Sequence, residues 1–248
     1  MRQQVKGNIF ARGKSEIPDG EKELLAAATR KARNKLANTV VMLSQAINRY
    51  SSYDGMNSEL RESLELYFLL HTEKNVNDRL KRMVEIDKKL RKIQQGLAGR
   101  IELENISRKH WIKNRKYYEN HCKKRNFTRL QQAKGKAPLL GVLGYVTFSM
   151  LTKPSNIHLA FAFLFDEEAS AHTIVHEASH KFAETKDHAY WNTTAKRFKK
   201  KLTCKKAIDN ADSYAGFAMD FDPAMMRIPP RVLSRRGRAS ISSLKGRR

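Results

Sequence analysis

Apolar residues recur at helical spacing through the first hundred positions of the chain. The stretches 20–47, 58–70 and 75–99 place an apolar residue at about every third or fourth position, which is typical of helices that bury one face. A polar break at 51–55 separates the first two stretches. This pattern predicts that residues 19–104 form a helical layer with one apolar face.

The pattern changes in the second half of the chain. Two runs of strand-like composition, 139–150 and 157–164, are separated by a short Lys-Pro-Ser break. A proline-free and glycine-free stretch at 167–182 predicts a helix, and 192–202 and 205–219 also have helical patterns. We therefore expect an α+β fold that is mainly helical and contains a small antiparallel sheet.

The two ends of the chain are polar and basic. Residues 1–18 are expected to be a flexible basic N-terminus, and residues 223–248, with their prolines, glycines and arginines, a disordered basic tail. Between them, residues 19–222 are long enough for a single domain with a substantial core. We expect this domain to consist of the helical part 19–104 and a part with the sheet and the chemistry, 105–222.

Charge adds a second line of inference about partners. Lysine and arginine number 49 against 25 aspartate and glutamate residues, which gives a net charge of +24. Basic residues are dense in 106–136, where aromatic residues are interleaved with them. Such a balance predicts attraction to anionic surfaces and nonspecific binding to nucleic acid. A basic nucleic-acid-binding protein is therefore an alternative function, although no known nucleic-acid module can be recognised.

The sequence contains few features that indicate a cellular compartment. Only two cysteines occur, Cys122 and Cys204, so a disulfide framework is excluded. Met1–Phe10 contains no apolar run of the kind found in a secretory signal peptide, and no stretch approaches the ~18 apolar residues of a membrane-spanning helix. The sequence predicts a soluble protein without a conventional signal, and export would require a non-classical route or a secretion machine.

The strongest chemical signal is the pattern HExxH, formed by His176, Glu177 and His180. Residues four apart lie on one face of a helix, so the two imidazoles can reach one zinc ion. Glu177 then lies beside the metal, where it can take a proton from a bound water. The pattern is short, and a surface helix with two hydrogen-bonded histidines is the alternative interpretation.

A catalytic zinc site normally has three protein ligands. Glu184 continues the same helical row, but it lies two turns from His176, a rise of about 12 Å that is too long for a shared ion. Asp187 and His188 follow His180 by seven and eight residues, where a turn could bring either of them back. Spacing alone does not choose between these two candidates.

Three motifs in this order resemble one peptidase family. The stretch from Thr185 to Tyr190 has the pattern TxDxxY, and the stretch from Asn210 to Phe217 begins with Asn-Ala-Asp. Together with HExxH they resemble the aspzincins, the deuterolysin-like zinc peptidases, and most closely their lysine-specific metalloendopeptidase branch. The resemblance covers 20–222 and is sharpest from His172 to Phe217. It implies a zincin-like fold with HExxH on the active-site helix.

The resemblance also assigns roles. It implies that Asp187 is the third zinc ligand, beside His176 and His180. It implies that Tyr190 donates a hydrogen bond to the oxyanion of the tetrahedral intermediate, a use that suits a donor near developing charge. Asp212 would lie near the pocket for the residue after the scissile bond. Without the resemblance, Tyr190 could be a packed aromatic residue and Asp212 a carboxylate that caps a helix or supports the site.

The chain departs from the family pattern at three positions. Glu184 and Trp191 stand where glycines usually flank TxDxxY, and Ala215 stands where the lysine-specific members have a second acid. Strict lysine specificity is therefore not expected, although Asp212 could still attract a basic side chain.

The sequence as a whole favours a zinc-dependent endopeptidase that acts on protein or peptide substrates. We expect Glu177 to be the general base, and an extended substrate to pair with an edge strand at 157–164. Delivery as a toxin or effector would fit the basic flanks and the scarcity of cysteine. An inactive domain that zinc merely stabilises is a further alternative.

Overall fold

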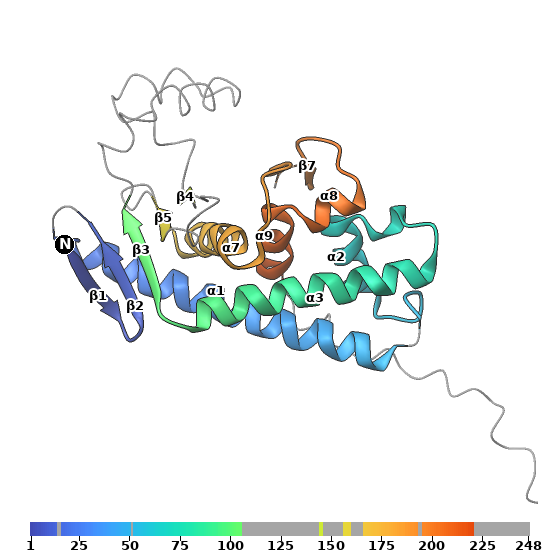
Figure 1. The fold of residues 1–248 in the computed structure, drawn as a ribbon, viewed down its shortest axis with the longest axis horizontal. Coiled ribbons are helices and arrows are strands. Elements are labelled where there is room, and N and C mark those ends of the chain that lie inside the picture. The colour runs from blue at the N-terminus through green and yellow to red at the C-terminus, as the bar shows by residue number, and fades with distance from the viewer. Residues whose placement is uncertain are drawn as a thin grey trace, which may run out of the picture.

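Long helices form the body of the molecule. A computed structural model describes the chain over residues 1–13, 16–50, 52–105, 144–145, 156–159, 166–192 and 195–220. Helix α1 (Asp19–Arg49) and helix α3 (Val76–Ala98) lie side by side and run along most of the molecule's length, and α2 (Ser58–Phe68) and the short 3-10 helix η1 (Leu70–Thr72) connect them (Figure 1). The predicted helical layer is present in these residues, and the boundaries of its helices differ by at most two residues from the expected ones.

Local hydrogen bonds explain where two of these helices begin. The side chain of Asn57 accepts a hydrogen bond from the Leu60 N–H at 3.0 Å, and the side chain of Asn75 accepts one from the Asn77 N–H at 2.9 Å. Each asparagine thereby satisfies a backbone donor that the first turn of a helix leaves without a partner.

The sheet is mixed rather than antiparallel, which corrects the sequence-based expectation. Its strand order is β1-β2-β3-β5-β4. The pairs β2–β3 and β3–β5 are parallel, whereas β1–β2 and β5–β4 are antiparallel. Parallel pairing requires long connections, and the helices between the strands supply one of them. The strands are β1 (Arg2–Lys6), β2 (Ile9–Arg12), β3 (Ile101–Asn105), β4 (Gly144–Tyr145) and β5 (Ile157–Leu159).

The N-terminus was expected to be flexible, and this expectation is wrong for residues 1–13. They form the hairpin β1–β2, and the tight turn between the strands contains Gly7 with φ 55°, a conformation that glycine adopts without strain. Ile9 and Ala11 are buried and lie opposite Ile101 and Leu103 of β3. The apolar alternation in β2 covers only two positions, which is too short to stand out in a basic segment.

The two strand-like runs predicted for the sheet are only partly described. Residues 144–145 form β4 and residues 157–159 form β5, and the remainder of 139–150 and of 157–164 lies outside the described residues. Strand β5 pairs with β3 on one side and with β4 on the other. It is therefore not an edge strand, which contradicts the expectation that a substrate pairs with it. The predicted disordered tail, 223–248, also lies outside the described residues.

The C-terminal part contains helix α7 (Glu167–Ala183), the hairpin β6–β7 (Trp191–Asn192 and Arg197–Phe198) and the helices α8 (Cys204–Ile208) and α9 (Ala211–Met219). The helix predicted over 192–202 is wrong, because this segment contributes to the hairpin instead. Its residues 196–201 contain one apolar side chain among five basic ones, so a helix there would have no apolar face to bury.

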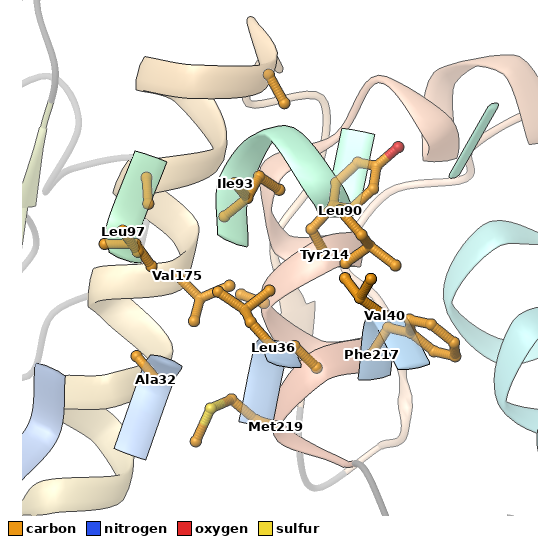
Figure 2. Packing of buried hydrophobic residues seen from close by; sticks show 14 of the residues in the cluster. Ala32, Leu36, Val40, Leu90, Ile93, Leu97, Val175, Tyr214, Phe217 and Met219 are labelled. Carbon is orange, nitrogen blue, oxygen red and sulfur yellow. The ribbon is translucent and has the colours of Figure 1, made fainter. Parts of the chain in front are cut away.

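One hydrophobic core joins the N-terminal helices to α7 and α9. Figure 2 shows that side chains of α1, α3, α7 and α9 meet in this core, and every labelled side chain is buried. Val175 reaches this core from the helix that also carries His176 and Glu177, so the packing fixes that helix from behind. None of the helices in the described residues is long and apolar enough to cross a membrane. The labelled residues are Ala32, Leu36, Val40, Leu90, Ile93, Leu97, Val175, Tyr214, Phe217 and Met219.

Candidate active site

Helix α7 carries the HExxH pattern. The side chain of Asp166 accepts a hydrogen bond from the Ala169 N–H at 2.7 Å and so caps the helix. His176 and His180 are four residues apart, and each is only 8% exposed. The helix ends at Glu184, which adopts the left-handed conformation with φ 56°. This reversal turns the chain back toward the histidines.

The segment after the reversal is anchored to α7. The hydroxyl groups of Thr185 and Ser179 are hydrogen bonded at 2.8 Å, and the Ser179 hydroxyl also donates to the carbonyl oxygen of His176 at 2.7 Å. All three residues are buried. Thr185, the threonine of the TxDxxY motif, is therefore held against α7, the helix that precedes it.

The same segment is anchored on its other side to the start of α9. Lys186 forms a parallel bridge with Asn210. The Asn210 side-chain Oδ1 accepts hydrogen bonds from the backbone N–H groups of His188 and Ala189, at 2.9 and 3.0 Å. Asp187 lies between these anchored residues, so its backbone is fixed on both sides.

Three ligand-type atoms converge in front of α7. The Nε2 atoms of His176 and His180 are 3.2 Å apart, and the Asp187 Oδ1 lies 3.1 Å from the first and 3.3 Å from the second. Zinc binds nitrogen and oxygen ligands at about 2.0–2.2 Å in a tetrahedron, whose ligand-to-ligand edges are then roughly 3.3 Å. The triangle that these atoms form therefore has the size that a zinc ion requires, and it forms one candidate metal site among the described residues.

The other ring nitrogens are held by protein acceptors. The His180 Nδ1 donates a hydrogen bond to the carbonyl oxygen of Thr185 at 2.7 Å, because a carbonyl oxygen can only accept. The His176 Nδ1 lies 2.6 Å from the Asp212 Oδ1. With Nδ1 carrying the proton, each Nε2 presents its lone pair to the triangle, the orientation that metal-ligating histidines have.

The electrostatics of the triangle favour a positive charge. Burial lowers the pKa of His176, but its hydrogen bonds to Asp187 and Asp212 outweigh this effect, and the pKa lies well above its usual range. Burial acts to raise the pKa of Asp187, but the hydrogen bonds to His176 and His180 hold it well below its usual range. A carboxylate that strongly prefers its ionised form, facing two imidazoles, is suited to a cation.

Glu177 is buried beside the triangle. It is 4% exposed, and its Oε2 has no hydrogen bond within the described part of the chain. Burial raises the pKa of Glu177 to about 7, against the lowering effect of charge on His176 and His180. A carboxyl group with a pKa near neutrality and an oxygen without a partner can take up a proton and release it again.

The structure brings Asp187 to the histidines and turns His188 away. The His188 Nε2 lies 3.1 Å from the Asp209 Oδ2, and this carboxylate is also paired with Lys89 of α3 and with Lys186. Of the two third-ligand candidates left open by the spacing, Asp187 therefore has the fitting geometry.

Tyr190 lies at the rim of the triangle. Its hydroxyl donates a hydrogen bond to the Asp187 Oδ2 at 2.8 Å, and its ring is stacked on that of His176, with the centroids 6.0 Å apart and an angle of 10°. A hydroxyl donor is thus available next to the carboxylate.

Asp212 lies behind His176, and it is 6% exposed. One of its oxygens is bonded to the His176 Nδ1, and the other accepts the Trp191 N–H at 2.6 Å. Both oxygens therefore have partners inside the protein. These contacts support the second interpretation, a carboxylate that supports the site, and none of them supports the expected role in the substrate pocket. Ala215, three residues later, is fully buried.

Sequence reasoning assigned no role to Thr185 or Asn210, although each belongs to a motif on which the family resemblance rests. Their contacts give the reason for their place in those motifs. Thr185 orients His180, and Asn210 holds the loop that presents Asp187. A polar residue inside a motif that also contains a ligand, such as Thr185 two residues before Asp187, is the signal that could have suggested such a role.

The α+β fold and the three converging ligand atoms are compatible with a metallopeptidase, and one comparison with known proteins points to the same class. Residues 107–219 match the aspzincin family model, which describes the lysine-specific metallo-endopeptidase. No curated protein and no solved structure matches the chain. Over residues 107–219 the chain is similar to the aspzincin family, whose members are zinc-dependent and act on proteins or peptides. The match does not favour the nucleic-acid-binding alternative.

Proposed function

We propose that this protein is a zinc-dependent endopeptidase whose ion is held by His176, His180 and Asp187. One observation carries the proposal. Three ligand atoms lie within 3.3 Å of one another, and the unpartnered oxygen of a buried carboxylate belongs to the residue next to one of them. A zinc ion held there supplies the Lewis acidity that polarises a peptide carbonyl and makes water easier to deprotonate.

Glu177 is proposed as the general base. It accepts the proton of the attacking water on its free Oε2 and then delivers that proton to the leaving amine. Its burial supports this role, since burial raises the pKa of the carboxyl group to about 7. A group with this pKa can both accept and donate a proton near neutral pH.

Tyr190 is proposed to stabilise the oxyanion. Its hydroxyl lies at the rim of the triangle, where it is bonded to Asp187. When the carbonyl oxygen of the substrate gains negative charge, this hydroxyl can donate to it, which stabilises the transition state more than the substrate. Loss of one such donor typically lowers kcat by about 10²–10³.

The test is the substitution Glu177→Gln, with Glu167→Gln as the matched control. Both residues lie on α7, but Glu167 is exposed and far from the triangle. Glu177→Gln should still bind one zinc ion per chain, and its cleavage of casein should fall by at least about 10²-fold. Glu167→Gln should behave like the wild type. Cleavage by Glu177→Gln at the wild-type rate would refute the role of this base.

The same measurement separates the enzyme from an inactive zinc-stabilised domain. Such a domain would bind zinc through His176 and His180 and gain thermal stability from it, but the wild type would cleave no peptide in a mixed library. Zinc content and cleavage in the wild type therefore decide between the two functions.

The peptidase unit is proposed to extend over 19–222, beyond the segment that the family match covers. The packing of α1 and α3 against α7 supports this extent, since the helix that carries the histidines buries its apolar face on them. The hairpin of residues 1–13 extends the same core through Ile9 and Ala11.

A further inference from the structure

A run of positive charge lies directly beside the candidate site. We call residues 196–201 the basic segment, since five of its six residues are lysine or arginine and the sixth is Phe198. The five charged side chains are exposed, and none forms an ion pair with a carboxylate in the described part of the chain. They are Lys196, Arg197, Lys199, Lys200 and Lys201.

Several other cations of the described residues are paired with carboxylates instead. Arg91 is paired with Asp87 at 2.7 Å, Arg82 with Glu85 at 3.0 Å, and Lys89 with Asp209 at 3.2 Å. Those pairs reduce the field of each charge. In the basic segment the charges add, so a positive potential remains for a partner from outside.

Backbone hydrogen bonds fix the basic segment to the site. Strand β7 pairs with β6 so that Phe198 lies opposite Trp191. The Lys199 N–H then donates to the carbonyl oxygen of Tyr190 at 2.9 Å. The hydroxyl of that same tyrosine is bonded to Asp187, a member of the triangle. One residue thus joins the proposed metal ligands to the basic segment.

The basic segment lines an open depression of about 550 Å³. No acidic residue contributes to its lining. A second depression, of about 480 Å³, includes Lys196 and Arg197 but also Glu62 and Glu65 of α2. Positive charge is therefore balanced on the side of α2 and left unbalanced in the first depression. The first depression is lined by Asn192, Arg197, Phe198, Lys199 and Lys201.

We propose that this depression is a subsite for an acidic side chain, so that the enzyme prefers peptides with aspartate or glutamate close to the scissile bond. The inference rests on the proposed peptidase function and adds the class of substrate. Lysine and arginine donors recognise a carboxylate by charge-assisted hydrogen bonds. Phe198 contributes apolar surface for the stem of a glutamate side chain. A lysine in the same position would meet only positive charge.

The test uses three fluorogenic peptides that differ at one residue near the cleaved bond, which is glutamate, glutamine or lysine. The wild type should cleave the glutamate peptide with a kcat/KM roughly three- to tenfold above that of the glutamine peptide, the range that two exposed charge pairs provide. The lysine peptide should be the poorest of the three. The preference should shrink at high salt, because salt screens exposed charges.

The variant Lys199→Gln/Lys201→Gln should reduce the glutamate-to-glutamine ratio to about one. The matched control Lys88→Gln/Lys92→Gln removes the same charge from exposed lysines of α3 and should keep the wild-type ratio. Equal loss of the ratio in both variants would overturn the proposal, because the preference would then come from net charge. A wild-type ratio near one would overturn it as well.

A binding measurement keeps the inference testable if no peptide is cleaved. Glu177→Gln protein is titrated with the labelled glutamate and glutamine peptides, and fluorescence anisotropy gives the two Kd values. Tighter binding of the glutamate peptide that depends on Lys199 and Lys201 supports the subsite even if the peptidase function fails. A single-stranded oligonucleotide of equal charge is titrated in parallel. If it binds much more tightly through the same two lysines, the subsite is a nucleic-acid site and the proposal is wrong.

Discussion

Replacement of Asp212 by asparagine tests how the candidate site is held together. The carboxylate serves two donors, the His176 Nδ1 at 2.6 Å and the Trp191 N–H at 2.6 Å. Asparagine has nearly the same shape but only one acceptor oxygen, so its amide group would face one of these donors. Loss of such a partner behind a metal ligand typically lowers metal affinity by about 10–100-fold, which corresponds to ~1.4–2.7 kcal/mol.

The assay is zinc competition with a chromophoric chelator, with thermal unfolding of the same samples. We expect a weaker zinc Kd for Asp212→Asn and a loss of stability of about 1–3 kcal/mol from the buried donor without a partner. Asp209→Asn is the control, because Asp209 contacts His188 and Lys89 instead of the triangle. An unchanged zinc Kd together with an altered cleavage preference would refute this reasoning and restore Asp212 to the substrate pocket.

Three further predictions concern stability and extent. Gly96→Ala should destabilise the fold by about 1–3 kcal/mol in urea unfolding, because a Cβ at this position would overlap the Phe182 ring. The control is Gly20→Ala, which should be neutral or mildly stabilising because a Cβ there would meet nothing within 4 Å. Equal effects of the two substitutions would contradict the packing. Glu184→Gly should raise the Tm, since the left-handed conformation at φ 56° costs a non-glycine residue ~1–2 kcal/mol, and a lower Tm would argue against that conformation. A fragment of residues 107–219 should lack cooperative unfolding by circular dichroism, because α7 would lose its packing on α1 and α3, and a cooperative transition would show that the matched segment folds alone.

The helical part of the fold could be predicted because its signals are long and repeated. The α3 stripe of Met83, Ile86, Leu90, Ile93 and Leu97 is fully buried, and a period repeated over about four turns leaves little ambiguity. The short elements could not be predicted in the same way. Strand β2 has two buried residues and β6 and β7 have two residues each, so long-range pairing rather than local pattern decides their conformation.

The candidate site was predictable to the extent that it lies on one helix. The spacing of four residues brings His176 and His180 together in any α-helix. The position of the third ligand, Asp187, depends on the path of a loop. Asn210, more than twenty residues later in the sequence, holds this loop by hydrogen bonds, and the reversal at Glu184 sets its direction. Spacing therefore left Asp187 and His188 equal, and only the family resemblance favoured the first.

The role of Asp212 shows why motif knowledge and geometry answer different questions. The motif identifies the residue as important, but its two carboxylate oxygens decide what it does, and both are engaged inside the protein. Asp212 is only 6% exposed, so its carboxylate offers little surface to a lysine of the substrate. Ala215 stands in place of a second acid and Asp212 is bonded to His176 and Trp191, while exposed lysines line the neighbouring depression. The same scaffold thus has the charge pattern for a substrate of the opposite sign.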